Sequence, residues 1–198
     1  MPYDVSDLPA APEGDDTDRL PGAQRHDETA LAARLEVRPA RTEELAAAGE
    51  VVAAAYLHDL RVNPVYADRL RDTATRAAQA TLLVAVDTDD DDTVLGSVTY
   101  ARGGTRYAQL AAADECEIRM LGVRPDARGR GIAELLVRAA MARGAADGAV
   151  RMVLSTQTEM QAAQRLYERL GFTRRPDLDW VPEQDRSVQL IAYERALR

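Results

Sequence analysis

Residues 117–134 constrain the fold of this chain more than any other stretch. Residues 117–123 have the apolar content of a short strand, and Pro125 cannot continue a strand's hydrogen-bond ladder. Apolar side chains then recur at the helical spacing i, i+3, i+4, i+7 and i+8, in Ile132, Leu135, Leu136, Ala139 and Ala140. The chain therefore passes from a strand into a helix through a turn made of glycine and arginine.

Such a turn is suited to hold an anion. The first backbone N–H groups of a helix are unpaired and carry partial positive charge, so a phosphate can accept hydrogen bonds from them. Gly129 and Gly131 have no side chain to block that approach, while Arg128 and Arg130 add positive charge. An ordinary strand-to-helix turn with solvated arginines is the alternative. The dinucleotide fingerprint is excluded, because Glu134 stands where its third glycine would be.

The residue types that are missing exclude several chemistries. All 25 basic residues are arginine, so a Schiff-base lysine, a pyridoxal phosphate anchor and a Walker-type lysine are excluded. The lone cysteine, Cys116, rules out internal disulfides and thiolate zinc clusters, and a buried, inert thiol is the favoured reading of it. We expect no metal.

Charge and composition divide the chain into two parts. Residues 1–33 carry eight acids against two arginines, with four prolines and little periodicity, which predicts a disordered acidic tail. Residues 34–198 are long enough for one folded domain. The net charge of -8 and the lack of a basic stripe argue against nucleic-acid binding. We see no signal peptide and no membrane-spanning run, and expect a cytoplasmic protein without membrane contact.

Periodicity and breakers predict the order β-α-α-β-β-β-α-β-α-β-β. Strands are expected at 35–39, 81–86, 94–101, 115–123, 150–155, from 171 and at 188–193. Helices are expected from a cap at Thr42 to about residue 60, at 65–79, after the glycine-arginine turn and at 159–170. Thr158 and Gln161 suggest a capping box for the last helix. On that helix Tyr167 shares an apolar face, which leaves two readings open, a core tyrosine with a satisfied hydroxyl or a functional phenol.

The turn at 124–134 and the segment AQRLYERLGF at 163–172 together resemble the GNAT (Gcn5-related N-acetyltransferase) family. The first matches the acyl-coenzyme A motif in Arg128, Gly131 and Ala133, and the second matches the tyrosine-bearing helix of that family. The resemblance implies a mixed α/β (α+β) fold with a central, mostly antiparallel sheet of about seven strands. Helices would cover both faces, and the sheet would be splayed between its fourth and fifth strands.

The resemblance also implies roles for particular residues. Backbone amides of the segment from Arg128 through Gly129, Arg130, Gly131, Ile132 and Ala133 would hold the pyrophosphate of acetyl-CoA. The strand edge at Leu121 and Val123 would pair with the pantetheine arm, which behaves like an added strand. Tyr167 would protonate the departing thiolate. The family's usual asparagine seven residues before the tyrosine is replaced by Met160, so one cofactor contact is missing or supplied by Ser155, Thr156 or Gln157.

A base is also needed, because an amine with a lysine-like pKa of about 10.4 is deprotonated at pH 7 in only about one molecule in 2,500. Glu117 is the candidate, since two-residue alternation gives it one face with Arg119 and Leu121. A Glu117–Arg119 ion pair is the equally open alternative. Tyr56, His58 and Asp59 lie near the helix connection that shapes the acceptor site in similar proteins, with a solvated helix end as the alternative.

These observations predict an acyl-CoA dependent N-acyltransferase that moves acetyl from acetyl-CoA to a primary amine by direct attack in a ternary complex. The competing hypothesis is a weakly active or inactive module that binds acyl-CoA as a sensor. The acceptor amine is not identified by the sequence, and a homodimer is one open alternative for the oligomeric state.

Overall fold

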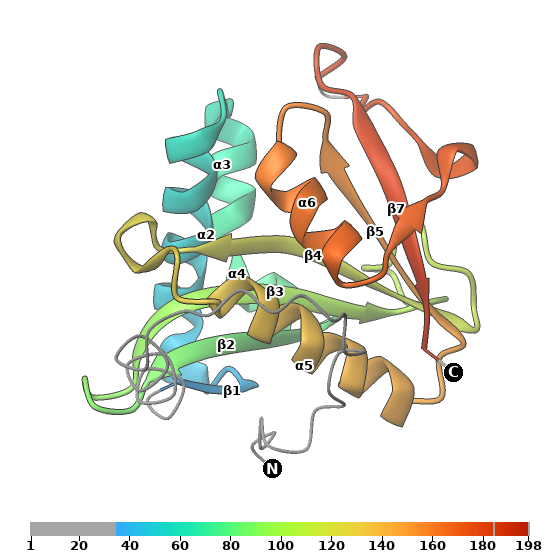
Figure 1. Ribbon diagram of the computed structural model, residues 1–198. Helices are drawn as coiled ribbons and strands as arrows, with labels where there is room; N and C mark the ends of the chain where they lie inside the picture. Colours follow the sequence, from blue (N-terminus) through green and yellow to red (C-terminus); the bar gives the residue numbers. More distant parts are fainter. Residues whose placement is uncertain (1–34, 184, 198) are drawn as a thin grey trace, which may run out of the picture.

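The computed structural model describes residues 35–183 and 185–197 (Figure 1), so the expected tail at 1–33 lies outside the described residues. The strands are β1 (Leu35–Pro39), β2 (Thr81–Asp87), β3 (Thr93–Arg102), β4 (Glu115–Val123), β5 (Arg151–Gln157), β6 (Thr173–Arg174) and β7 (Leu190–Ala196). The helices are α2 (Leu45–Asp59), α3 (Pro64–Arg71), α4 (Thr73–Ala77), α5 (Ile132–Ala146) and α6 (Gln161–Arg169), with short 3-10 turns at η2 (Thr42–Glu44), η3 (Pro125–Ala127) and η4 (Pro176–Leu178). The expected element order is confirmed.

The strands form one seven-stranded sheet in the order β1-β2-β3-β4-β5-β7-β6. Every neighbouring pair is antiparallel except β4 and β5, which are parallel because α5 crosses over between them. Helices α5 and α6 lie on one face, and α2, α3 and α4 on the other (Figure 1). The mixed, mostly antiparallel fold expected from the resemblance is thus confirmed.

Each face of the sheet has its own apolar core. The larger cluster lies between the sheet and α5 and α6, and includes Ile118, Leu136, Leu154 and Tyr167. A smaller cluster joins α2, α3 and β4 through Val52, Ala53, Leu70 and Met120. Gly122 allows the close approach of α2, since a Cβ atom there would lie 2.8 Å from the Val52 Cα. Strand β4 is therefore covered on both faces.

The sheet opens into a fork between β4 and β5. These strands pair only over four residues each, from Glu115 with Arg151 to Ile118 with Leu154. Beyond them, β4 continues beside β3 to Val123, while β5 continues beside β7 to Gln157. The splay expected between the fourth and fifth strands is present, and the later part of β4 has one edge that none of the described strands covers.

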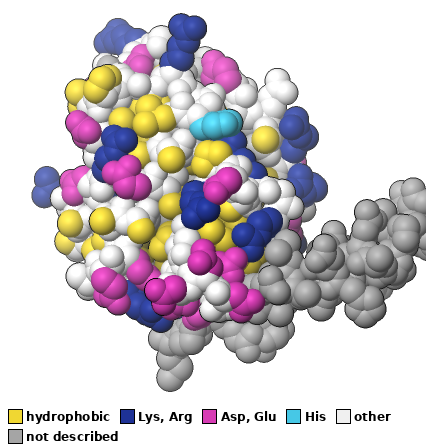
Figure 2. Space-filling view, turned by 90° about the vertical axis from the view of Figure 1, so that its left-hand side faces the viewer, with side chains coloured by type: hydrophobic (Ala, Val, Ile, Leu, Met, Phe, Trp, Pro, Cys, Tyr) yellow, Lys and Arg dark blue, Asp and Glu magenta, His cyan; other side chains and the backbone are white. Residues whose placement is uncertain are grey.

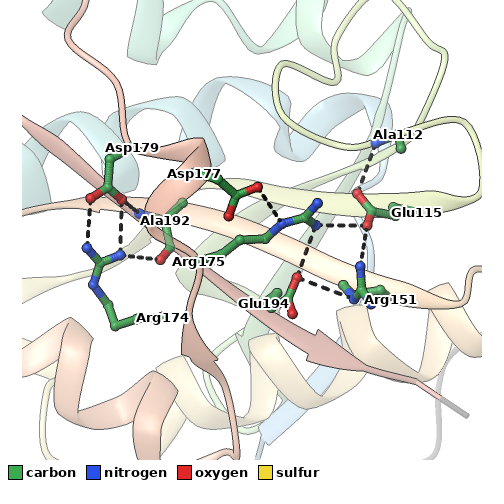
Figure 3. A network of polar contacts seen from close by, with 9 residues as sticks. All are labelled: Ala112, Glu115, Arg151, Arg174, Arg175, Asp177, Asp179, Ala192 and Glu194. Atoms are coloured by element: carbon green, nitrogen blue, oxygen red, sulfur yellow. Dashed lines mark hydrogen bonds and ion pairs between the residues drawn. The ribbon is translucent and has the colours of Figure 1, made fainter.

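The paired end of the fork is tied by a polar network (Figure 3). Buried Glu115 binds Arg151 of β5 at 3.0 Å and Arg175 at 2.9 Å, and accepts a hydrogen bond from the Ala112 N–H. Arg175 also contacts Glu194 of β7 at 3.0 Å. The network joins three strands where they converge, at the opposite end from the opening.

Two expected caps are wrong. Thr42 does not cap α2 but begins η2, whose N-cap is Arg41, and the Glu44 carboxylate accepts from the Arg41 N–H and binds buried Arg38. Thr158 does not cap α6, because its hydroxyl turns to Glu159 and the helix begins after Met160, without a side-chain cap.

The second expected helix, at 65–79, is interrupted at Asp72, which leaves α3 and α4 as separate elements. The Asp72 carboxylate accepts from the Thr75 N–H, and a side chain that caps a new helix start favours such a break.

None of the described helices is long and apolar enough to cross a membrane.

Candidate active site

The turn between β4 and α5 is built as an open helix start. Gly129 and Gly131 both have left-handed backbone, with φ of 78° and 74°, a region that glycine enters at little cost. A Cβ atom at either position would meet no other atom within 4 Å. Helix α5 begins at Ile132 without a side-chain cap. Its first N–H groups are therefore available to an outside acceptor.

This helix start borders a groove of about 630 Å³ at the open end of the fork. Its walls come from four places, namely the end of α2, the edge of β4, the glycine-arginine turn and the start of α6. All of the predicted cofactor residues except Arg130 line it, in the set Leu121, Val123, Arg128, Gly129, Gly131, Ile132 and Ala133. Met160 and Leu166 line the opposite wall. Figure 2 shows one side of the molecule, where apolar side chains are exposed between arginine and acidic groups.

The two arginines of the turn are already bound to acids from distant parts of the chain. Arg128 donates to both oxygens of Asp59, at 2.8 and 2.9 Å, and Arg130 donates to Asp87 at 2.9 Å. Burial opposes the charged form of Asp59, but the bonds from Arg128 and His58 keep its pKa below the ordinary value. The backbone, rather than these guanidinium groups, is thus the free donor set of the turn. Local sequence patterns carry no signal for such pairs.

Tyr167 lies deep beside the groove. This residue is only 5% exposed. Its ring packs edge-on against the Phe172 ring, with 5.8 Å between the ring centres, and lies tilted against the Tyr193 ring at 6.1 Å. Burial raises the pKa of the phenol. Tyr167 belongs to the apolar core cluster, and its hydroxyl makes no hydrogen bond within residues 35–183 and 185–197. The inward orientation is confirmed. Tyr167 itself does not line the groove, but its phenol acts electrostatically on Tyr56, which does.

Glu117 is held by the loop before β4. One carboxylate oxygen accepts from the N–H groups of Gln109 and Leu110, each at 2.7 Å, and from that of Ala111 at 3.3 Å. The other oxygen lies 3.5 Å from Arg119 Nε, so the ion pair is present. The carboxylate is buried, and it closes the 102–114 loop onto β4.

A β-bulge in β4 corrects the expected alternation. Between the Ser97 and Thr99 partners, β4 contains one extra residue, and Met120 has a positive φ of 54°. Met120 then packs with α2 and α3, whereas Leu121 packs with the α5 and α6 cluster. Leu121 therefore does not share a face with Glu117 and Arg119, and the bulge turns it into the groove.

Comparisons with known proteins agree with this geometry. The model of the acetyltransferase (GNAT) family matches residues 54–172. The curated N-alpha-acetyltransferase 30 of Schizosaccharomyces pombe is 35% identical over 85 residues, which are 43% of this chain and 54% of that protein. The chain thus spans about half the length of this relative.

Solved structures share the fold at lower identity. The structure of yncA from Salmonella typhimurium with its cofactor acetyl-CoA has a TM-score of 0.62 and 21% identity, over 83% of this chain and 95% of that one. The NatC complex bound to Gag peptide and CoA gives a TM-score of 0.61 and 22% identity, over 83% of this chain and 99% of the other.

Proposed function

Since this chain belongs to the acetyltransferase (GNAT) family, we propose that residues 34–198 form an acyl-CoA dependent N-acyltransferase domain. In this proposal acetyl passes from acetyl-CoA to a primary amine by direct attack in a ternary complex. The observation that carries it is the uncapped start of α5 beside a groove of about 630 Å³. Acetyl-CoA would supply the activated thioester.

The groove suits that cosubstrate in two respects. Backbone amides from Arg128 to Ala133 are available for a pyrophosphate, because left-handed glycines expose them and no side chain caps them. On the side away from β3, the β4 edge at Leu121 and Val123 has no strand of residues 35–183 and 185–197 beside it, so the amide groups of a pantetheine arm can pair with it as an added strand. These features support binding through the backbone, with Arg128 and Arg130 bracing the turn through their acidic partners.

Tyr167 is proposed as the proton donor to the departing thiolate. Its raised pKa keeps the phenol protonated at neutral pH, and its hydroxyl has no competing acceptor in the described part of the chain. A thiol has a reference pKa of about 8.5, so this proton assists departure of the sulfur without being indispensable.

Glu117 is proposed as the group that removes the proton from the amine. Deprotonation at pH 7 costs about 4.6 kcal/mol for an amine with a pKa of about 10.4. The oxygen that faces Arg119 accepts none of the three loop N–H bonds, and this oxygen would receive the proton directly or through a water.

The acceptor is proposed as a primary amine on the strength of the relatives. One is an N-alpha-acetyltransferase, and another is a complex with a bound peptide. The identity covers less than half of this chain. From these relatives we therefore take only the chemical class of the acceptor, a primary amine.

Tyr167→Phe tests the proposal against the sensor alternative. Thiol release from acetyl-CoA is measured across a panel of amines, with Tyr193→Phe as the control, because this neighbouring buried tyrosine is engaged with Glu168. Wild type should turn over at least one amine, Tyr167→Phe should turn it over about 10 to 100 times more slowly, and the control should keep its rate. Saturable acetyl-CoA binding without turnover of any amine would favour the sensor.

A further inference from the structure

A buried cation lies behind β4 without an anionic partner. Arg76 of α4 is 2% exposed, and its Nη1 donates to the carbonyl oxygen of Leu70 at 2.8 Å and to the Met120 sulfur at 3.1 Å. Its Nε and Nη2 atoms are buried and have no hydrogen-bond partner, and it forms no ion pair within the described ranges. Buried charges are normally paired. An unpaired guanidinium therefore points to a missing anion.

Three tyrosines act electrostatically on this cation, and one of the three lines the groove. Tyr56 lines the groove, and its ring lies 6.2 Å from that of Tyr66. The Tyr107 hydroxyl reaches the same Met120 sulfur as Arg76, at 3.6 Å. Burial raises the pKa of Tyr56, Tyr66 and Tyr107, and all three feel the charge of Arg76. All three rings are half-buried, so the group combines an apolar lining with hydroxyl groups.

A second arginine stands at the fork itself. Arg119 follows Ile118, the last β4 residue paired with β5, and its guanidinium lies 5.2 Å from the centre of the Tyr107 ring. Its Nε lies 3.5 Å from a Glu117 oxygen, and the other Glu117 oxygen accepts from loop N–H groups. Its Nη1 and Nη2 donate to the Tyr107 carbonyl oxygen and to Gln109 Oε1. Among the described residues, Glu117 is the one carboxylate in an ion pair with either arginine, and Asp72 acts on Arg76 only through space, so the group keeps an excess of positive charge.

We propose that Tyr56, Tyr66, Tyr107, Arg76 and Arg119, here called the tyrosine-arginine cluster, bind the acceptor, and that this acceptor is a small amine carrying a carboxylate. The inference rests on the proposed acetyl transfer, whose site it deepens. The carboxylate satisfies the unpaired nitrogens of Arg76 and the excess charge, while the tyrosines hold the carbon skeleton beside the groove.

The cluster also favours the reactive form of such a substrate. An aminocarboxylate loses its ammonium proton to become a net anion, and nearby guanidinium groups stabilise that anion over the neutral zwitterion. The amine lone pair then attacks the acetyl carbon. Glu117 takes the ammonium proton and passes it to solvent. The C–N bond then forms, the C–S bond breaks, the thiolate takes a proton from Tyr167, and the second amine proton restores that phenol.

The test compares amino acids with their own carboxamides. Phenylalanine and phenylalaninamide, and alanine and alaninamide, differ in the carboxylate and in the amine pKa. The value of kcat/KM for acetyl transfer is therefore measured for each pair and expressed per free amine. We expect wild type to prefer the carboxylate member at least tenfold. Arg119→Gln should reduce that preference to less than threefold. Arg106→Gln, an exposed change one residue from Tyr107, should leave it unchanged.

Arg76→Gln should likewise reduce the preference for the carboxylate member of each pair. Acetyl-CoA binding by this variant, measured by titration, shows that its groove is folded. Arg119→Gln keeps the test valid if Arg76→Gln does not fold, because Arg119 is partly exposed. Binding of N-acetylalanine against N-acetylalaninamide, measured by calorimetry, gives a second readout that needs no turnover. Equal use of both members of each pair by an active enzyme overturns the carboxylate specificity alone. Absence of acetyl-CoA binding overturns the proposed function instead.

Discussion

Gly131 offers the sharpest test of the backbone phosphate site. Its φ is 74° and the space around its Cβ position is open. Different substitutions there can therefore distinguish three effects, namely backbone strain, side-chain bulk and charge. Gly131→Ala introduces only the strain, which costs about 1 kcal/mol in the left-handed region and lowers the melting temperature by roughly 3 °C. Gly131→Gln adds bulk, and Gly131→Glu adds nearly the same bulk with a negative charge.

The magnitude of the charge effect follows from the geometry. A carboxylate about 4 Å from a phosphate charge is repelled by about 1 kcal/mol in water and about 4 kcal/mol at an effective dielectric constant near 20. The groove is open on one side, so an intermediate value of about 2 kcal/mol is appropriate. This corresponds to roughly thirtyfold weaker acetyl-CoA binding by Gly131→Glu than by Gly131→Gln.

The assay is calorimetric titration of each variant with acetyl-CoA at two salt concentrations. The Glu-to-Gln ratio should shrink at high salt, because partly exposed charges are screened. With S-acetylpantetheine, which lacks phosphate, the KM values of the two variants should be equal. If Gly131→Glu and Gly131→Gln bind acetyl-CoA equally well, no phosphate lies near this turn and the reasoning fails.

Three further predictions concern β4. Glu117→Gln should lower kcat about a hundredfold and leave the acetyl-CoA affinity unchanged, because a base is lost. A rise in the KM of the amine alone would mean that Glu117 only anchors the loop. Glu115→Gln should lower the melting temperature by about 4–8 °C, because a buried carboxylate no longer neutralises Arg151 and Arg175; a smaller change than 2 °C contradicts this. Burial opposes ionisation of Glu115, yet its hydrogen bonds hold its pKa below the ordinary value of about 4.3. The difference in stability between wild type and Glu115→Gln should therefore be full above that pH and disappear as the pH falls through the lowered pKa. Melting temperatures of both proteins measured from pH 3 to 7 will show this dependence. Gly122→Ala should destabilise the protein by about 1–3 kcal/mol, because its Cβ would strike α2, and an unaltered denaturant midpoint would contradict that contact.

The sequence allowed the element order and the position of the turn to be predicted, because both depend on local signals. Pro125, the two glycines and the apolar period of α5 act within a few residues, as does the face that turns Tyr167 inward. The resemblance to a known family then predicted the fork, which the structure contains, and the proposed roles of the residues around it. Periodicity alone predicts neither.

The parts that could not be predicted depend on distant contacts or on a change of register. Arg128 and Arg130 find Asp59 and Asp87, which lie far away along the chain, and no pattern near the turn reveals them. One extra residue at Met120 reverses the alternation of β4, so Leu121 reaches the groove instead of the face of Glu117. No sequence pattern around Arg76 signals that its side chain is buried, because the burial arises only from tertiary packing.

The short pairing between β4 and β5 makes this fold suitable for division into two fragments. A cut at the exposed Gly148, between α5 and β5, would separate a β1–β4 piece from a β5–β7 piece. The two pieces would meet through four residue pairs, the Glu115 network and the apolar side chains beneath α5 and α6. A ligand in the groove would touch both fragments and so strengthen their association. The affinity of one fragment for the other would therefore rise when the ligand is present, and its measurement would detect the ligand.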